Sequence, residues 1–175
     1  DSSESITENA SDAGTDVVAI VTSTNFANMT SDSFNNIEQI RFAGSNKTGT
    51  FTGLQFTGET LTITETAAGT SNLIINVGSG ETATFTNITA TTFTSGSDTV
   101  TINGSGGNEH ITSANLLACN INGGNGNDTI IAGTQNDVID GGDGEDSLTG
   151  GMGDDTYLFD TNDVDGNESI TENPG

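Results

Sequence analysis

Residues 123–158 decide the fold of this chain, and they read GGNGNDTIIAGTQNDVIDGGDGEDSLTGGMGDDTYL. The stretch divides into four consecutive units of nine residues, namely GGNGNDTII (123–131), AGTQNDVID (132–140), GGDGEDSLT (141–149) and GGMGDDTYL (150–158). Each unit begins with turn-forming residues, mostly glycine, and has an aspartate at its sixth place and a large apolar residue at its eighth. The sixth places are Asp128, Asp137, Asp146 and Asp155, and the eighth places are Ile130, Ile139, Leu148 and Tyr157.

The first six residues of each unit have the chemistry of a cation-binding turn. Glycine permits left-handed backbone conformations, so several carbonyl oxygens of one turn can face a single point. Calcium takes 6 to 8 oxygen ligands, and carbonyls plus one carboxylate supply about half of that number, so two turns must share each ion. The predicted calcium ligands are the four aspartates together with turn residues Gly123, Gly124, Asn125, Gly126, Gly133, Gly141, Gly142, Asp143, Gly144, Gly150, Gly151 and Gly153.

The last three residues of each unit have the pattern of a short strand. Side chains alternate between the two faces of a strand, so the eighth residue points inward while the seventh and ninth point outward. Two units then complete one coil of a right-handed parallel β-roll, and turns about 18 residues apart stack at ~4.8 Å. This stacking pairs Asp128 with Asp146 and Asp137 with Asp155. Without metal, stacked carboxylates repel by roughly 1 kcal/mol in water and by more when buried, so we expect folding to require calcium.

The four units resemble the RTX (repeats-in-toxin) family, whose repeat is GGxGxDxUx with U large and apolar. The resemblance implies a secreted calcium-binding β-roll. The second unit departs from the pattern, because Ala132 and Gln135 stand where the family has glycine, and this affects its predicted turn geometry. The alternative is a flexible linker rich in glycine and aspartate, but a linker has no reason to place large apolar residues at one phase.

Composition limits the function further. A length of 175 residues fits one domain, and 25 acidic residues against Arg41 and Lys47 give a formal charge of −23. This charge excludes nucleic acid and anionic lipid as partners and favours divalent cations. The chain has no run of about 20 apolar residues, so we expect no membrane insertion. It begins at Asp1 without a methionine or signal peptide, and we expect a fragment or a processed piece.

Residues 16–103 contain short runs that alternate apolar and polar residues and are bounded by Gly, Asn, Ser or Asp, as half-buried strands are. We therefore predict an all-β solenoid with four parts: a polar junction at 1–15, coils without regular calcium motifs at 16–103, the calcium-binding roll at 104–160 and a second junction at 161–175. At about 18 residues per coil the rod would be roughly 45 Å long. Degenerate units at 93–101 and 104–112 offer Asp98 and Glu109 as further candidate ligands, or as solvated turn residues.

The sequence offers little for catalysis. His110 is the only histidine and lies in a degenerate unit, where we expect a turn or outward strand residue. The sequence lacks the HExxH zinc motif and the GxSxG nucleophile elbow. Cys119, the only cysteine, lies in the apolar run LLACNI and is predicted to be a buried small residue, with an intermolecular disulfide as the alternative. We therefore predict that the chain is not an enzyme.

The hexapeptide ESITEN occurs twice, at 4–9 and at 168–173, just outside the predicted solenoid at both ends. This repetition predicts a tandem module, or copies of the chain that stack head to tail. A non-closing contact of that kind generates a filament, and the open strand edges of a solenoid favour it.

Three non-enzymatic functions agree with these features. The first is a calcium-binding structural module of a secreted bacterial surface protein, such as a surface layer, an adhesin or an extracellular filament. The second is the calcium-folded export domain of a larger type I secreted enzyme or toxin. The third is a segment that binds ice or carbohydrate, suggested by the threonine pairs Thr62/Thr64, Thr84/Thr86 and Thr99/Thr101.

Overall fold

The computed structural model is an all-β solenoid of parallel strands, and it describes residues 14–29, 34, 37–93, 97–113, 117–161, 163 and 167–173. A short 3₁₀ turn, η2 (Gly53–Gln55), lies among these residues. The strand pairs in the three sheets are parallel, as the nonapeptide pattern predicts. The predicted N-terminal junction lies almost wholly outside the described residues, and residues 14–15 precede the first strand.

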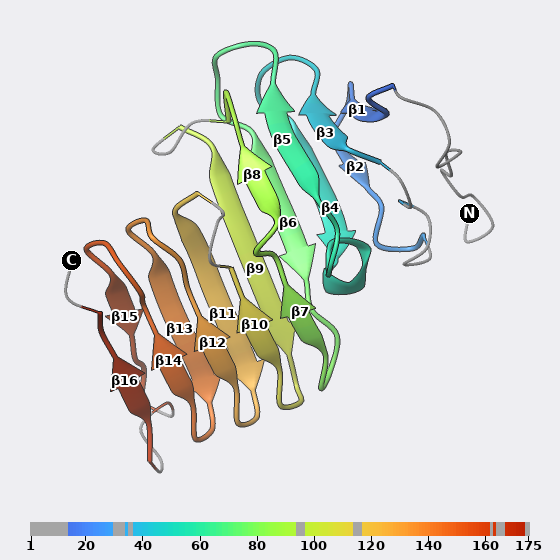
Figure 1. Cartoon of the computed structure of the whole chain (residues 1–175). Coiled ribbons are helices and arrows are strands. Elements are labelled where there is room, and N and C mark those ends of the chain that lie inside the picture. Colours follow the sequence, from blue (N-terminus) through green and yellow to red (C-terminus); the bar gives the residue numbers. More distant parts are fainter. Residues whose placement is uncertain are drawn as a thin grey trace.

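One wall of the solenoid is a seven-stranded sheet that runs along the whole molecule (Figure 1). Its strands, in spatial order, are β2 (Thr24–Asn25), β4 (Thr48–Thr52), β6 (Asn72–Asn76), β9 (Thr99–Ser105), β11 (Cys119–Asn125), β13 (Val138–Asp143) and β15 (Thr156–Leu158). Their spatial order follows the order in the sequence, so the chain winds steadily in one direction.

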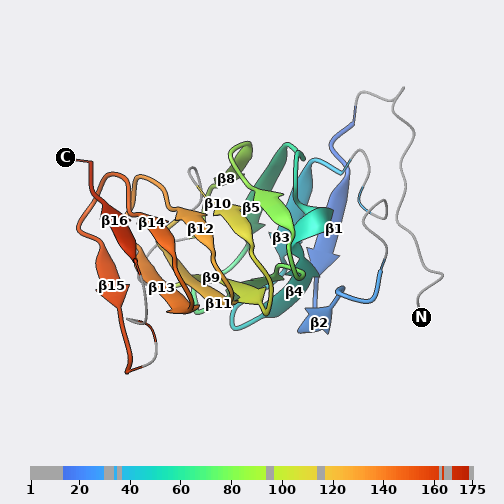
Figure 2. The same ribbon diagram turned by 90° about the horizontal axis from the view of Figure 1, so that it is seen from below.

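Two sheets in succession form the opposite wall (Figure 2). The first contains β1 (Val17–Ile20), β3 (Gln39–Phe42), β5 (Leu61–Glu65) and β8 (Ile88–Ala90). The second contains β7 (Thr82–Thr84), β10 (His110–Thr112), β12 (Thr129–Ile131), β14 (Ser147–Thr149) and β16 (Ser169–Thr171). Within the second sheet, β10, β12 and β14 directly follow Glu109, Asp128 and Asp146.

Coil length changes along the solenoid. In the N-terminal half, the hydrogen bond between Asp16 and Glu38 joins residues 22 positions apart on successive coils, and that between Asn72 and Thr99 joins residues 27 positions apart. In the nonapeptide region Asn122 bonds Asp140, and the interval is 18 positions. The predicted coil length is correct for the repeats and wrong for the segment before them. The chain therefore makes fewer coils, and a shorter rod, than the sequence analysis predicted.

The core changes in step with the coil. The wide coils are filled by phenylalanines, of which Phe26 and Phe51 stack with ring centroids 4.8 Å apart, while Phe51 and Phe56 meet edge to face at 4.9 Å. The narrow coils bury aliphatic side chains that are 0–2% exposed, namely Ile111, Ile121, Ile130, Ile139 and Leu148. Longer coils enclose more space, and aromatic rings fill it.

The only cysteine and the only histidine of the sequence, Cys119 and His110, both lie in strands of the solenoid. Cys119 is 2% exposed and its thiol donates to the Leu117 carbonyl at 2.9 Å, which confirms a buried small residue and disfavours a disulfide between chains. Burial raises the pKa of this thiol. His110 lies on β10 beside the buried Ile111, on the outward face of the strand, as predicted.

Truncating Phe51, which is fully buried, should lower the free energy of unfolding by about 3–5 kcal/mol, because Phe51→Ala leaves a cavity among the other rings. Urea unfolding in calcium would measure the change. Phe159→Ala removes the same ring from a site that is 42% exposed, and it should cost far less. Equal losses for the two variants would contradict this account of the core.

Candidate metal centre

The turns that follow from the nonapeptides stack into two columns of carboxylates. His110, Thr129 and Ser147 share one register, so the residues before them, Glu109, Asp128 and Asp146, lie one above another and form column one. In the same way, Val138 pairs with Thr156, so Asp137 and Asp155 form column two. The structure thus places Asp128 beside Asp146 and Asp137 beside Asp155.

Each carboxylate reaches back to the coil before it. The Asp128 N–H donates to Asp146 Oδ1 at 2.8 Å, and the Asp137 N–H donates to Asp155 Oδ1 at 2.9 Å. Asp128, Asp137 and Asp146 are only 1–2% exposed. One oxygen of each upper group is therefore fixed between two turns, with most of the charge held away from water.

The second carboxylate oxygens of the columns show that a positively charged partner is missing. Asp128 Oδ2 and Asp155 Oδ2 are buried and have no hydrogen-bond partner. The sequence contains no lysine or arginine after Lys47, so no side chain of that kind within the repeats can neutralise the columns. A buried charge without a partner is strongly unfavourable. The donor set consists of hard oxygens, which calcium prefers.

Backbone carbonyls supply the rest of a possible site. Gly124 and Gly142 have φ of +104° and +88°, and a Cβ on Gly142 would overlap the Gly124 carbonyl oxygen of the turn below. The same close approach recurs further along each turn, where a Cβ on Gly144 would overlap the Gly126 oxygen. Successive turns therefore bring carbonyl oxygens close to the next turn at a spacing that only glycine allows.

The other predicted turn residues fall into two groups. Gly123, Gly141 and Gly150 leave room for the carboxylate of their own unit, since a Cβ on any of them would strike Asp128, Asp146 or Asp155 respectively. Asn125 and Asp143 are exposed, and the Asp143 carbonyl accepts the Gly126 N–H at 2.7 Å. Gly151 and Gly153 have φ of +101° and +123°, as in the first and third units.

The second unit has a different turn. Neither Ala132, Gly133 nor Gln135 is among the described residues with positive φ, so this turn lacks the left-handed conformations of the other three. Asp137 compensates by accepting two backbone hydrogen bonds, from Cys119 at 2.7 Å and from Gly133 at 3.1 Å. The substitutions noted in the sequence do change the turn geometry.

Burial raises the pKa of the column carboxyls. The pKa of Asp128 rises to about 6, mainly because the group is buried, with the charges of Glu109 and Asp146 adding to the effect and the Glu109 N–H opposing it. Burial also raises the pKa of Asp137, and the charge of Asp155 adds to it. These are the changes expected of stacked acids without a counter-charge.

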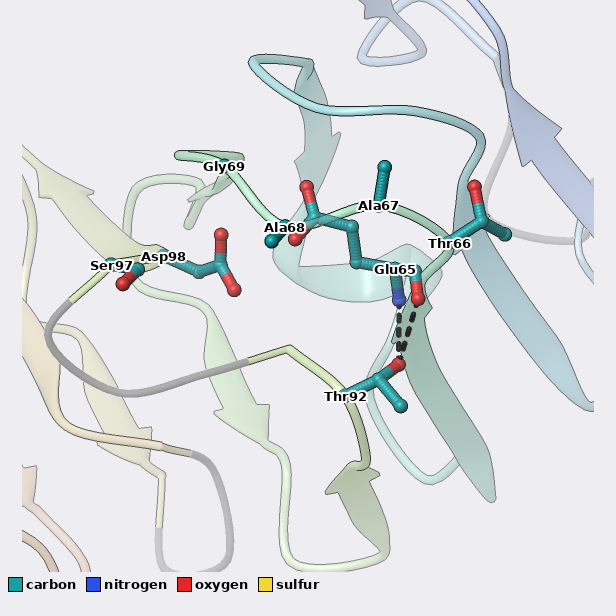
Figure 3. A pocket seen from close by; sticks show the side chains of 8 residues that line it. All are labelled: Glu65, Thr66, Ala67, Ala68, Gly69, Thr92, Ser97 and Asp98. Carbon is teal, nitrogen blue, oxygen red and sulfur yellow. Dashed lines mark hydrogen bonds between the residues drawn. The ribbon is translucent and has the colours of Figure 1, made fainter.

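Asp98 does not belong to either column. Its Oδ1 accepts the Ser71 N–H at 2.8 Å, and the Ser71 hydroxyl donates to Glu65 at 2.6 Å. Figure 3 shows Asp98, Glu65 and Thr92 around a hollow of about 500 Å³ between wide coils. The Thr92 hydroxyl bonds both the N–H and the carbonyl of Glu65. Both carboxylates thus already accept hydrogen bonds from Ser71.

Sequence reasoning missed an asparagine ladder at the fifth place of the units. The Asn127 N–H donates to Asn108 Oδ1 at 3.0 Å, and the Asp154 N–H donates to Asn136 Oδ1 at 3.0 Å. The recurring Asn at this place was the available signal. Within the described ranges, no three side chains of His, Cys, Asp or Glu are grouped to hold a metal, so most ligands would have to be backbone oxygens.

Comparison with known proteins agrees with this geometry. Residues 122–157, about a fifth of the chain, match the family model of the RTX calcium-binding nonapeptide repeat in four copies. A search found no match among curated proteins and none among solved structures. In the part of the chain that the structure describes, no helix has the length and apolarity needed to cross a membrane.

The raised pKa values predict how pH acts on the calcium-free protein. A carboxyl whose pKa is raised by folding binds its proton more tightly in the folded chain, so stability falls as pH rises from about 4 to about 6. Circular dichroism in calcium-free buffer should show less folded β-structure at pH 7 than at pH 5. Asp128→Asn should flatten this dependence. Greater stability of the calcium-free protein at pH 7 would contradict the prediction.

A methyl group on Gly142 should damage the stacked turns. Gly142→Ala places a Cβ at φ +88° and against the Gly124 oxygen, which costs about 1–2 kcal/mol for the conformation alone. The calcium concentration at the folding midpoint, followed by circular dichroism, should rise. Gly106→Ala is the matched control, because nothing lies within 4 Å of its Cβ, and its midpoint should stay near that of the wild type.

Proposed function

From the four RTX repeats in residues 122–157, we propose that the chain is a non-enzymatic calcium-binding structural module of a secreted bacterial surface protein. The observation that carries this proposal is the pair of carboxylate columns. Most of their members are buried, two of their oxygens lack any partner, and no lysine or arginine follows Lys47. A cation that binds carbonyl and carboxylate oxygen satisfies all three conditions.

The proposed ligands are those predicted from the sequence. One calcium ion lies between the turns of Asp128 and Asp146, and another lies between the turns of Asp137 and Asp155. The remaining ligands are backbone oxygens of the turn residues Gly123, Gly124, Asn125, Gly126, Gly133, Gly141, Gly142, Asp143, Gly144, Gly150, Gly151 and Gly153. The crowded carbonyls of Gly124 and Gly126 support this assignment.

Calcium would drive folding at the place where the protein works. At low calcium, repulsion within the columns opposes the stacked turns. Extracellular calcium-binding modules have Kd values of about 10⁻⁴ to 10⁻³ M, so millimolar calcium fills them. Binding to the folded state alone then stabilises it. Because RTX repeats are typical of secreted proteins, we place the module outside the cell, at the bacterial surface.

The ends of the solenoid support assembly of copies or tandem modules. β15 and β16 are the last strands of their sheets, and Leu158 and Ile170 on them are 47% exposed. β16 is formed by the second ESITEN segment, and the first segment, 4–9, lies outside the described residues. Open parallel edges with exposed apolar residues invite further strands. We propose that a neighbouring module continues the sheets head to tail, as a filament, surface layer or adhesin array.

The threonine pairs that suggested ice or carbohydrate binding are divided between the two walls. Thr62 and Thr64 lie on β5 and Thr84 ends β7, in the two separate sheets of one wall, whereas Thr99 and Thr101 lie on β9 in the opposite wall. A flat ligand surface would need them side by side, so this function loses its main support.

Light scattering with electron microscopy, first in excess EDTA and then in millimolar calcium, tests the proposal. We expect calcium to convert an expanded chain into compact particles that join into rods. Asp137→Asn combined with Asp146→Asn should strongly weaken the calcium response, because each of the two proposed sites loses a carboxylate. Ile170→Lys, which charges the exposed end, should leave calcium-dependent folding intact and prevent rods.

Two other outcomes would count against parts of this proposal. A compact calcium-bound monomer that never assembles would favour the export domain of a larger secreted protein. A chain that is equally compact in EDTA and in calcium would refute calcium-driven folding.

A further inference from the structure

Column one extends beyond the matched repeats. Glu109 occupies the register position directly below Asp128, although it lies outside residues 122–157. Glu109 is 2% exposed, so its carboxylate is as buried as the aspartates above it. The turn that carries it, residues 104–109, ends the last wide coil, and the turn of 123–128 ends the first narrow one.

The pair Glu109 and Asp128 is built like the pair Asp137 and Asp155, which lies wholly inside the matched repeats. The Glu109 N–H donates to Asp128 Oδ1 at 2.7 Å, and the Asp137 N–H donates to Asp155 Oδ1 at 2.9 Å. In both pairs the upper aspartate then has a buried Oδ2 without a partner. The upper carboxylate points at the turn below in the same way.

The lower acids of the two pairs are also held alike. Glu109 Oε2 accepts the N–H of Ser105, four residues earlier, at 2.8 Å. Asp137 Oδ2 accepts the N–H of Gly133, again four residues earlier, at 3.1 Å. The longer glutamate arm therefore folds back over its own turn, as the aspartate does.

Backbone carbonyls approach in the same manner at both places. A Cβ on Gly124 would overlap the Ser105 oxygen, and a Cβ on Gly151 would overlap the Gly133 oxygen. Gly124 and Gly151 have nearly equal φ, +104° and +101°. Asn108 accepts the N–H of the turn above at 3.0 Å, as Asn136 does in column two.

The likeness stops at Glu109 and does not include the acids at the ends of the column. Below it, Glu109 Oε1 accepts the N–H of Gly80, not that of the register neighbour Glu81. Above Asp146, Glu168 is only partly buried, although its Oε1 has no hydrogen-bond partner. Among the acids outside the matched repeats, Glu109 is therefore the one whose pairing repeats the arrangement of Asp137 and Asp155 in the described part of the chain.

We propose that the turns 104–109 and 123–128 share a further divalent cation, with Glu109 and Asp128 as its carboxylate ligands. Asp128 is 1% exposed, its Oδ1 already reaches the turn below, and its Oδ2 is buried without a hydrogen-bond partner. The proposal rests on the proposed function, because turn 123–128 also belongs to a matched repeat. The cation is calcium under extracellular conditions, and it ties the narrow calcium coils to the wide coil below them.

Native mass spectrometry of the whole chain in calcium counts the ions directly. Glu109→Gln keeps the shape of the side chain and should bind one ion fewer than the wild type. Glu145→Gln is the matched control, because it removes the same charge from an exposed residue next to Asp146, and its count should be unchanged. Asp128→Asn should lose two ions, since Asp128 would serve the sites on both sides of its turn.

Amide hydrogen exchange of β10 gives a second measurement. Loss of charge alone, without loss of the ion, should not change how much calcium slows this exchange. Calcium should slow exchange of residues 110–112 in the wild type and in Glu145→Gln, and it should do so much less in Glu109→Gln. If Glu109→Gln does not fold in calcium, Glu109→Asp, which keeps the charge on a shorter arm, should bind one ion more weakly.

The outcomes separate this inference from the proposed function. An unchanged ion count in Glu109→Gln, or undiminished binding of every ion by Glu109→Asp, would overturn the additional site. If Asp137→Asn still loses an ion in that case, the calcium roll itself stands. A wild-type chain that binds no calcium would remove both.

Discussion

The structure depends on a repulsion that the repeats cannot relieve with their own side chains. Stacking the nonapeptide turns brings Asp128 against Asp146 and Asp137 against Asp155. In each pair the backbone N–H of the lower aspartate donates to the carboxylate of the upper one, at 2.8 Å in the first pair and 2.9 Å in the second. No lysine or arginine occurs after Lys47. The geometry that forms the sheets is therefore the geometry that concentrates negative charge, and the binding of a cation would relieve this repulsion.

The side chains inside each coil must fill the space that the coil encloses, so coil length and core composition change together. A wide coil of the N-terminal half encloses enough space for a cluster of phenylalanine rings, whereas a narrow coil of the repeats accepts only one aliphatic side chain per strand. The wide coils can thus fold around an aromatic core such as that of Phe51, while the narrow coils have less apolar area to bury. The region with the smaller core is the region that carries the cation-binding turns.

The sequence predicted the fold of the nonapeptide region, where the same residue types recur every nine positions. The phase of Asp128 and Ile130 specifies a turn and an inward side chain, so the stacking of every second unit could be deduced. The length of the earlier coils could not, because their turns vary and no single residue type marks the rung. Cys119 shows the same limit, since it takes the place of an aspartate in column two, and only strand register reveals this.

The contacts that hold neighbouring coils together in the interior of the stack are missing at its end. Each coil buries the apolar face of the coil before it and completes the oxygen cup of that coil, so the last coil always lacks both. Tyr157, at the eighth place of the last unit, is only half-buried where its counterparts are fully buried, and Ile170 on β16 is 47% exposed. Figure 1 shows β15 and β16 at this end of the stack. One parallel strand added beside each of them would bury these side chains and extend both walls. The proposed cation binding and the proposed end-to-end contact would therefore both follow from one repeating unit that is never complete alone.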